Sequence, residues 1–325
     1  MKKLLLLITI LNTLLFSTLE MESDYIMLLS IDDDSYRDAK LRTESSKLKF
    51  SLLENNISID RFVLEKDSLI FQSTTPREKV VNLLKSDFPT FEVNEKENLY
   101  RLKISSNLDM ETSIDKTIEY LKDRYEMYGI YILDNWFLKV IAYFNNHTSI
   151  FIEKRDNNKI YIEVQHANSY AKKYIREQLG SYTTFGFYQV MENNHNRETS
   201  QKLEWVDNLN EHLYVSNLPI LTEDMILSVN IGFEIYSNAP LINFQLNELG
   251  TKIFERYTKE HIHQRIAVVI NRKIYSTPII MESIKGGTIQ ITGNFNIQEL
   301  QKISNSLNRS HHLPLVIEEK LERVQ

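Results

Sequence analysis

Hydrophobic and polar positions along this chain follow two different periods, which predict many short strands and a smaller number of helices. Between residues 36 and 56, apolar residues recur at the spacing of one buried helix face. Between residues 159 and 164, they occupy every second position, as in a half-buried strand. The predicted strands are residues 25–31, 57–63, 68–71, 91–93, 99–104, 159–164, 183–190, 229–236, 241–246 and 288–292, a hairpin over 265–280, and a last strand that begins at Pro314.

Glycine, proline and small polar residues set the expected ends of the helices. Pro76 starts one helix, and Gly129 and Gly180 close two others. Asn247 is the expected cap of a further helix. The predicted helices are residues 36–56, one from Pro76, 113–129, 168–179, 248–259 and 296–308. Because they are few and unevenly spaced for strict β–α alternation, we predict an α+β fold with antiparallel sheets.

Composition narrows the classes of function. At 325 residues, the chain is long enough for two compact units. The net charge of -6 gives no basic excess for a phosphate backbone, which argues against nucleic acid as a partner. The chain has no cysteine, so it offers no disulfide framework, thiolate zinc site or cysteine nucleophile.

The amino terminus carries a targeting pattern. Lys2 and Lys3 precede an apolar run at residues 4–19, and acidic residues follow it, which predicts export of the rest of the chain. The run is shorter than the roughly 20 apolar residues of a membrane span, so a signal peptide is the plain interpretation of residues 1–19. An uncleaved membrane anchor stays open, because no small residues mark a cleavage site near Ser17.

Motifs for catalysis or ligand binding are lacking. The glycines at 286, 287 and 293 match neither a dinucleotide fingerprint nor a P-loop, so a turn is the simpler interpretation. The pairs His261/His263 and His311/His312, and the acidic run at residues 32–34, lack the remaining ligands of a metal site. We therefore expect no enzyme, no catalytic residue, no cofactor and no metal.

Several segments resemble a known family. The strings FQLNELGTKIFERYTKEHIHQRIAVVINRKIYSTPII, ESIKGGTIQITGNFNIQEL and LPLVIEEK, together with IDKTIEYLKDRYEMYGI, KIYIEV and AKKYIREQLGSYTTFGFYQV, resemble the large periplasmic domain of SecD, a membrane subunit of the preprotein translocation machinery. The resemblance implies a ferredoxin-like base interrupted by an α+β head. By position, the base region is residues 25–190, with an α-β-β-α-β-β insert at 36–104. A connector follows at 191–212, then the head at 213–309 and a final strand at 314–324 that returns to the base.

The resemblance also implies a function. It points to an accessory component of Sec-dependent export on the extracytoplasmic side, periplasmic or anchored to the inner membrane. Its implied partners are preproteins and the membrane subunits of the translocase, SecF-like and the SecY complex. The membrane helices that follow this domain in SecD, which carry its proton-driven part, have no counterpart in this sequence. An exported, non-catalytic binding or scaffold protein, or a degenerate SecD remnant that no longer serves the translocase, stays open as the alternative.

The resemblance marks one set of signature residues. They match the Gly-Gly and ITGNF elements of SecD, and we expect them to fold the head and join it to the base rather than to bind a ligand. These residues are Gly286, Gly287, Thr292, Gly293, Asn294 and Phe295.

Overall fold

A computed structural model shows an α+β protein with mostly antiparallel sheets, as the sequence predicts. The chain forms two compact units. The first contains the described parts of residues 1–31, 114–180 and 315–325, and the second those of 32–113 and 181–314. The structure describes residues 25–65, 67–104, 114–115, 118–119, 131–132, 148–155, 159–166, 182–191, 198–208, 211–235, 237–292, 295–308 and 315–322.

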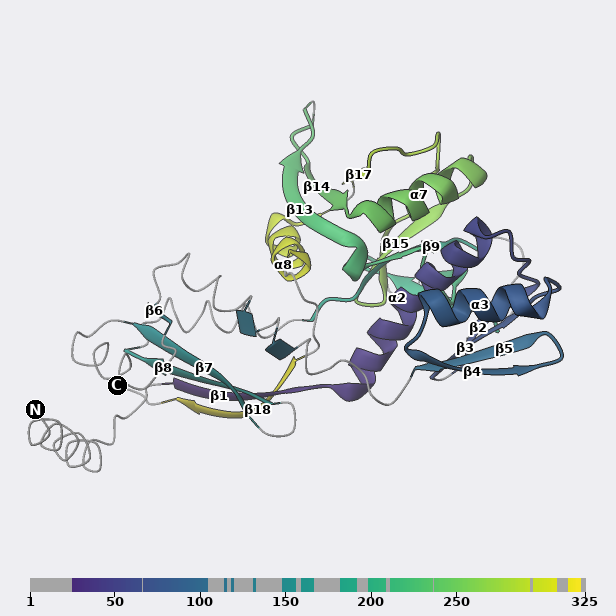
Figure 1. Cartoon of the computed structure of the whole chain (residues 1–325). Helices are drawn as coiled ribbons and strands as arrows, with labels where there is room; N and C mark the ends of the chain where they lie inside the picture. The colour runs from purple at the N-terminus through teal and green to yellow at the C-terminus, as the bar shows by residue number, and fades with distance from the viewer. Residues whose placement is uncertain are drawn as a thin grey trace, which may run out of the picture. The chain divides into compact units, whose positions relative to one another are not determined.

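The first unit is built on a five-stranded sheet with the order β18-β1-β8-β7-β6 (Figure 1). Strand β1, next to the edge strand, pairs antiparallel with both β18 and β8. Met27 and Leu29 on β1 are fully buried, because alternate side chains of a strand point to the same face. The strands are β1 (Tyr25–Ile31), β6 (Tyr131–Ile132), β7 (Ser149–Arg155), β8 (Lys159–Gln165) and β18 (Leu315–Glu322).

The insert of the second unit folds as two helices against a four-stranded sheet of order β2-β3-β5-β4. Leucines and aromatic residues on β3 and β5 pack against Leu48 and Leu52 of one helix and Leu84 of the other. Both helices therefore cover the same face of the sheet (Figure 1). The elements are α2 (Asp33–Glu54), β2 (Arg61–Glu65), β3 (Ser68–Gln72), α3 (Arg77–Asp87), β4 (Phe91–Lys96) and β5 (Leu99–Ile104).

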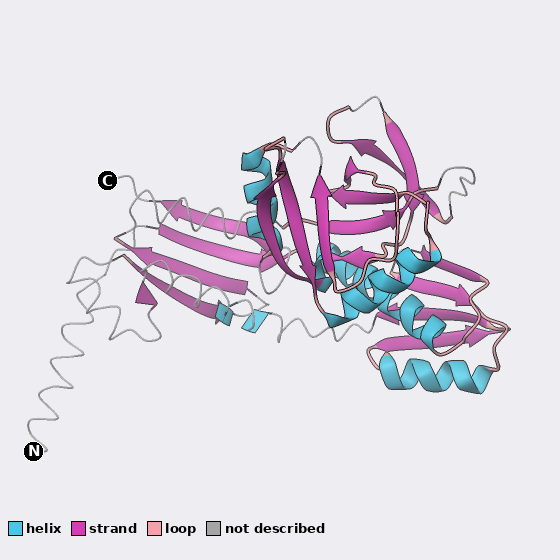
Figure 2. Ribbon diagram, turned by 90° about the horizontal axis from the view of Figure 1, so that it is seen from above, coloured by secondary structure: helices cyan, strands magenta, loops and turns pink. Residues whose placement is uncertain are grey.

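The remainder of the second unit has two sheets and two longer helices (Figure 2). One sheet has six strands in the order β11-β10-β16-β15-β9-β12, and the other has the order β13-β14-β17. The elements are β9 (Phe185–Gln189), β10 (Ser200–Trp205), β11 (His212–Ser216), β12 (Leu221–Thr222), η1 (Glu223–Met225), β13 (Ile226–Phe233), β14 (Pro240–Leu246), α7 (Glu248–Glu260), β15 (Ile266–Ile270), β16 (Lys273–Ser276), β17 (Thr288–Thr292) and α8 (Ile297–Leu307).

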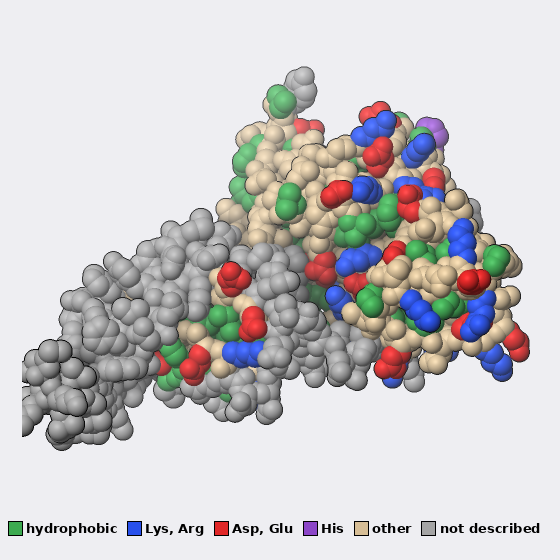
Figure 3. Space-filling model, viewed as in Figure 1, with side chains coloured by type: hydrophobic (Ala, Val, Ile, Leu, Met, Phe, Trp, Pro, Cys, Tyr) green, Lys and Arg blue, Asp and Glu red, His purple; other side chains and the backbone are tan. Residues whose placement is uncertain are grey.

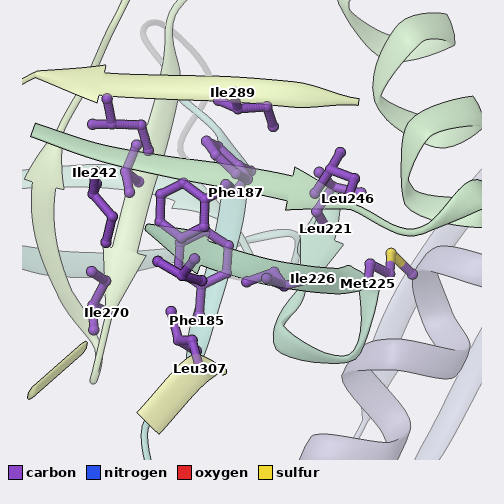
Figure 4. Close-up of a cluster of buried hydrophobic side chains, with 14 of the residues drawn as sticks. Phe185, Phe187, Leu221, Met225, Ile226, Ile242, Leu246, Ile270, Ile289 and Leu307 are labelled. Atoms are coloured by element: carbon purple, nitrogen blue, oxygen red, sulfur yellow. The ribbon is translucent and has the colours of Figure 1, made fainter. Parts of the chain in front are cut away.

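A shared apolar core holds these two sheets together. Phe185 and Phe187 on β9 meet Phe244 on β14, with ring centroids 4.8 Å apart for Phe185 and Phe244. Figure 4 shows Phe185 and Phe187 between the strands, with Leu307 of α8 on one side of the cluster. Burial of such large rings stabilises the fold because it removes apolar surface from water, and because stacked and edge-to-face ring pairs attract each other.

Helix caps agree with the sequence. Asn247 caps α7 by accepting a hydrogen bond from the Gly250 N–H, and Asn296 caps α8 in the same way. Asp32, from the acidic run, caps α2 by accepting from the N–H and the hydroxyl of Ser35. The acidic run therefore follows the end of a strand and begins a helix.

The division of the chain differs from the boundaries expected from the sequence. Residues 32–113, with the insert at 36–104, and residues 181–190 belong to the unit that contains the head. The expected connector at 191–212 contains β10 and the start of β11, and β7 was not predicted. The predicted helices at 113–129 and 168–179 lie almost entirely outside the described residues, apart from short helical pieces at 114–115 and 118–119.

Candidate functional site

The second unit contains an apolar cavity of about 220 Å³ between α2 and α7. A cavity of about 150 Å³ is enough for benzene, whereas pockets for drug-sized ligands start at about 300 Å³. The space therefore suits one large apolar side chain rather than a cofactor. The main apolar side chains of its wall are Phe50, Leu53, Phe62, Leu218, Ile220, Ile253 and Tyr257.

A buried ion pair holds α2 in the position that forms this cavity. The Arg42 guanidinium on α2 donates to Oε1 of Glu223 at 2.8 Å, and the two side chains are only 9% and 1% exposed. The Glu223 carboxylate also accepts from the Tyr182 hydroxyl at 2.8 Å and from the Phe185 N–H at 3.1 Å. Every oxygen of the buried carboxylate thus has a donor, which such a charge requires.

The electrostatics of this cluster follow from its burial. Burial lowers the pKa of Arg42, but Glu223 and the other acidic groups around the guanidinium together outweigh burial, so the pKa lies above its ordinary value. Burial raises the pKa of Tyr182, and the Glu223 charge raises it further. The tyrosine therefore stays protonated and donates to Glu223 throughout the physiological pH range.

Further polar contacts join α2 to the loops of the head. The Thr43 hydroxyl lies 2.9 Å from that of Thr222 and donates to Asp224 at 2.8 Å. The Ser46 hydroxyl donates to the Pro219 carbonyl at 2.8 Å. The small side chains of Thr43, Ser45 and Ser46 let the helix approach the β11–β12 connection closely, and this approach forms one wall of the cavity.

Charged side chains of Lys49, Arg256 and Glu260 also line the cavity. Arg256 on α7 pairs with Glu54 on α2 and, at 3.0 Å, with Glu260. Arg61 on β2 pairs with Glu198 at 2.9 Å. These ion pairs are partly exposed and therefore contribute little to stability. The apolar part of the wall is the feature that distinguishes the cavity. Figure 3 shows the same mixture of charged and hydrophobic side chains on one face of the second unit.

Tyr257 lines the cavity with a ring that stacks on His261, at 4.0 Å between centroids. Its hydroxyl is buried and has no hydrogen-bonding partner among the described residues. A buried hydroxyl without a partner costs about 1–3 kcal/mol. We therefore expect Tyr257→Phe to raise the free energy of unfolding by about 1 kcal/mol, measured by urea denaturation. A loss of stability would show that the hydroxyl has a partner in solution.

The signature residues lie in the head, away from this cavity. Gly286 and Gly287 both have positive φ, 77° and 70°, and form the turn into β17. Thr292 is the last residue of β17, and Phe295 is buried and stacks on Tyr275 at 6.1 Å. Gly293 and Asn294 lie outside the described residues.

The structure describes two of the four histidines named in the sequence analysis. His261 is the C-cap of α7, with Nδ1 at 2.8 Å from the Tyr257 carbonyl, and His263 adopts a positive φ of 66°. His311 and His312 lie outside the described residues. Across the described ranges, no group of three or more His, Cys, Asp or Glu could hold a metal ion. No helix in those ranges has the length and apolar character needed to cross a membrane.

Comparison with known proteins finds a family model that matches the C-terminal part of the chain. Residues 198–314 match the family model of the SecDF P1 head subdomain. The chain is 22% identical over 329 residues to the protein translocase subunit SecD of Calditerrivibrio nitroreducens, covering 91% of this chain and 58% of that protein. Over most of its length the chain is therefore similar to SecD. It is also 25% identical to the SecD of Rickettsia conorii, covering 90% of this chain and 56% of the relative.

The chain spans a little over half the length of these relatives. Among solved structures, the chain is similar to one described as a membrane component SecDF that enhances protein export. That similarity has 17% identity and a TM-score of 0.47, and it covers 72% of this chain and 98% of the other.

The residues around the cavity were not predicted as a site. They come from α2, β2, the β11–β12 connection and α7, which are separated by up to about 200 positions in the sequence. The pair Ser45 and Ser46 in the middle of an otherwise amphipathic helix was the only local signal of a close approach.

Proposed function

We propose that this chain is a SecD-like accessory component of Sec-dependent protein export that contacts preproteins on the extracytoplasmic side of the membrane. Homology to a protein translocase subunit supports the process. The apolar cavity between α2 and α7 supports the contact, since it has the volume of one large side chain. An unfolded preprotein exposes such side chains one after another, so a site of this size binds it without demanding a sequence.

The same proposal covers location and partners. The domain works outside the cytoplasm, where the leader at residues 1–19 delivers it, and its partners are preproteins and the membrane subunits of the translocase. This role requires no reaction, because a cavity wall whose exposed surface is mainly apolar can bind a side chain by contact alone. Binding energy and position are all that the site supplies.

Photocrosslinking tests the contact. A benzoylphenylalanine in place of Phe62, on β2 at the cavity, should form an adduct with a stalled preprotein in cells. The matched control replaces Asn94, an exposed residue on β4 at the opposite edge of the same sheet. We expect the adduct at least several-fold stronger from position 62 than from position 94.

Two results would contradict the proposal. Absence of preprotein adducts from both positions, with the protein correctly exported, would favour an exported scaffold protein that no longer serves the translocase. Equal adducts from both positions would show that the cavity has no special part in the contact. Denaturing gels probed for the preprotein distinguish these results.

A further inference from the structure

The two edge strands of the β13-β14-β17 sheet differ in whether their outward backbone groups are hydrogen-bonded. At the β13 edge, the Val229 N–H donates to Oδ1 of Asn308 at 2.6 Å. The Val229 carbonyl accepts from Nδ2 of Asn308 at 2.7 Å and from the Ser304 hydroxyl at 3.0 Å. An amide side chain from the end of α8 thus takes the place of a neighbouring strand, and the β13 edge is capped there.

The β17 edge has no such cap. The Leu246 N–H donates to the Gly287 carbonyl at 2.8 Å, which makes that pair a hydrogen-bonded one. Hydrogen-bonded and non-hydrogen-bonded pairs alternate in an antiparallel ladder, so Ile289 and Ile291 direct their backbone groups toward β14. The N–H and C=O groups of Thr288, Gln290 and Thr292 therefore point away from the sheet. They have no hydrogen-bonding partner among the residues that the structure describes.

The sequence of β17 also lacks the usual protection of an edge. Natural edges carry lysine, proline, a bulge or a covering element. The strand reads TIQIT, with no charge and no proline, and its register with β14 is unbroken. Thr288, Gln290 and Thr292 are exposed, while Ile289 and Ile291 are buried in the core, so the inward side chains anchor the strand.

We propose that the free edge of β17 binds an extended stretch of unfolded polypeptide as an additional strand of this sheet. The occupant is argued from complementarity: a row of outward backbone donors and acceptors matches another backbone, whatever its side chains. The exposed side chains beside the edge are neutral and small or flexible, so they exclude few sequences. This inference rests on the proposed contact with preproteins and adds a second site. That site binds main-chain groups, whereas the cavity binds side chains.

Gln290→Pro tests the edge without breaking the ladder. The Gln290 N–H points outward, so proline removes a donor to the incoming strand and places its ring where that strand would lie. Gln290→Thr keeps the N–H and serves as the matched control. We expect Gln290→Pro to weaken binding of an unstructured peptide rich in valine and threonine at least about tenfold. Gln290→Thr should stay within about threefold of the original chain.

The probe itself supplies a second comparison. The same peptide with every backbone amide N-methylated keeps its side chains and loses its donors, so it should bind the original chain no better than it binds Gln290→Pro. Binding is measured by fluorescence anisotropy on the purified full chain, and thermal unfolding by circular dichroism establishes that each variant is folded.

The outcomes separate this inference from the proposed function. If the peptide binds and neither Gln290→Pro nor N-methylation weakens it, the edge inference is wrong, while crosslinking through position 62 can still succeed. If the peptide does not bind, and Gln290→Pro instead abolishes concentration-dependent self-association, the occupant is a second copy of this chain and the inference is overturned. Failure of the crosslinking experiment alone contradicts the cavity contact and leaves the edge measurement valid.

Discussion

Arg42→Met should lower the free energy of unfolding of the second unit by about 3–5 kcal/mol, because it leaves the Glu223 carboxylate buried without a counter-ion. Methionine fills much of the same volume, so the loss reports the charge rather than a void. Since the pair joins α2 to the η1 turn, the variant should also expose α2 to proteolysis. Urea denaturation followed by circular dichroism measures the stability, and limited trypsin digestion measures the release of the helix.

A double-mutant cycle completes this test. Glu223→Gln in the Arg42→Met background removes the unpaired charge and keeps an acceptor for Tyr182, so it should recover part of the loss. Arg37→Met, on the same helix at a partly exposed position, is the control and should change stability by less than about 0.5 kcal/mol. A loss below about 1 kcal/mol in Arg42→Met would mean that the pair does not hold the helix.

This ion pair shows why the cavity could not be predicted from the sequence. Helix α7 and its cap at Asn247 were predicted because the apolar period and the capping residue lie within one short window. Arg42 and Glu223 are separated by 181 positions, and each alone is one charge among many. Their pairing depends on the tertiary fold, which local periodicity does not encode. The sequence analysis did not predict the association of the insert with the head for the same reason.

Strands β10 and β11 show a second limit. Residues 191–212 are polar and were predicted as a connector, yet β10 pairs antiparallel with β11 and parallel with β16. In β10, Ser200 and Leu203 are buried and Lys202 is exposed, so the apolar alternation is too weak to mark a strand. Backbone pairing with strands that are already in place decides the conformation there. The turn at Gly286 and Gly287 was predicted correctly, because glycine there is a local requirement.

Gly287→Ala is expected to destabilise the head by about 2–5 kcal/mol. About 1–2 kcal/mol comes from a non-glycine residue at φ of 70°, in the left-handed region. A further cost of about 1–3 kcal/mol comes from packing, since the added Cβ would overlap the Thr251 side chain on the first turn of α7. Thr251 is fixed by a hydrogen bond from its hydroxyl to the Asn247 carbonyl at 2.8 Å, so it cannot move aside without losing that bond.

Gly286→Ala is the matched control for this effect. Gly286 has nearly the same φ, 77°, but nothing lies within 4 Å of an added Cβ, so only the backbone cost of about 1–2 kcal/mol should appear. Thr251→Ala should restore part of the stability of Gly287→Ala and none of the stability of Gly286→Ala, because only the first variant suffers from the contact. Equal losses for the two glycines, measured by urea denaturation, would contradict this account. The packing of Gly287 against α7 would then have no part in fixing the start of β17, and with it the position of the open edge.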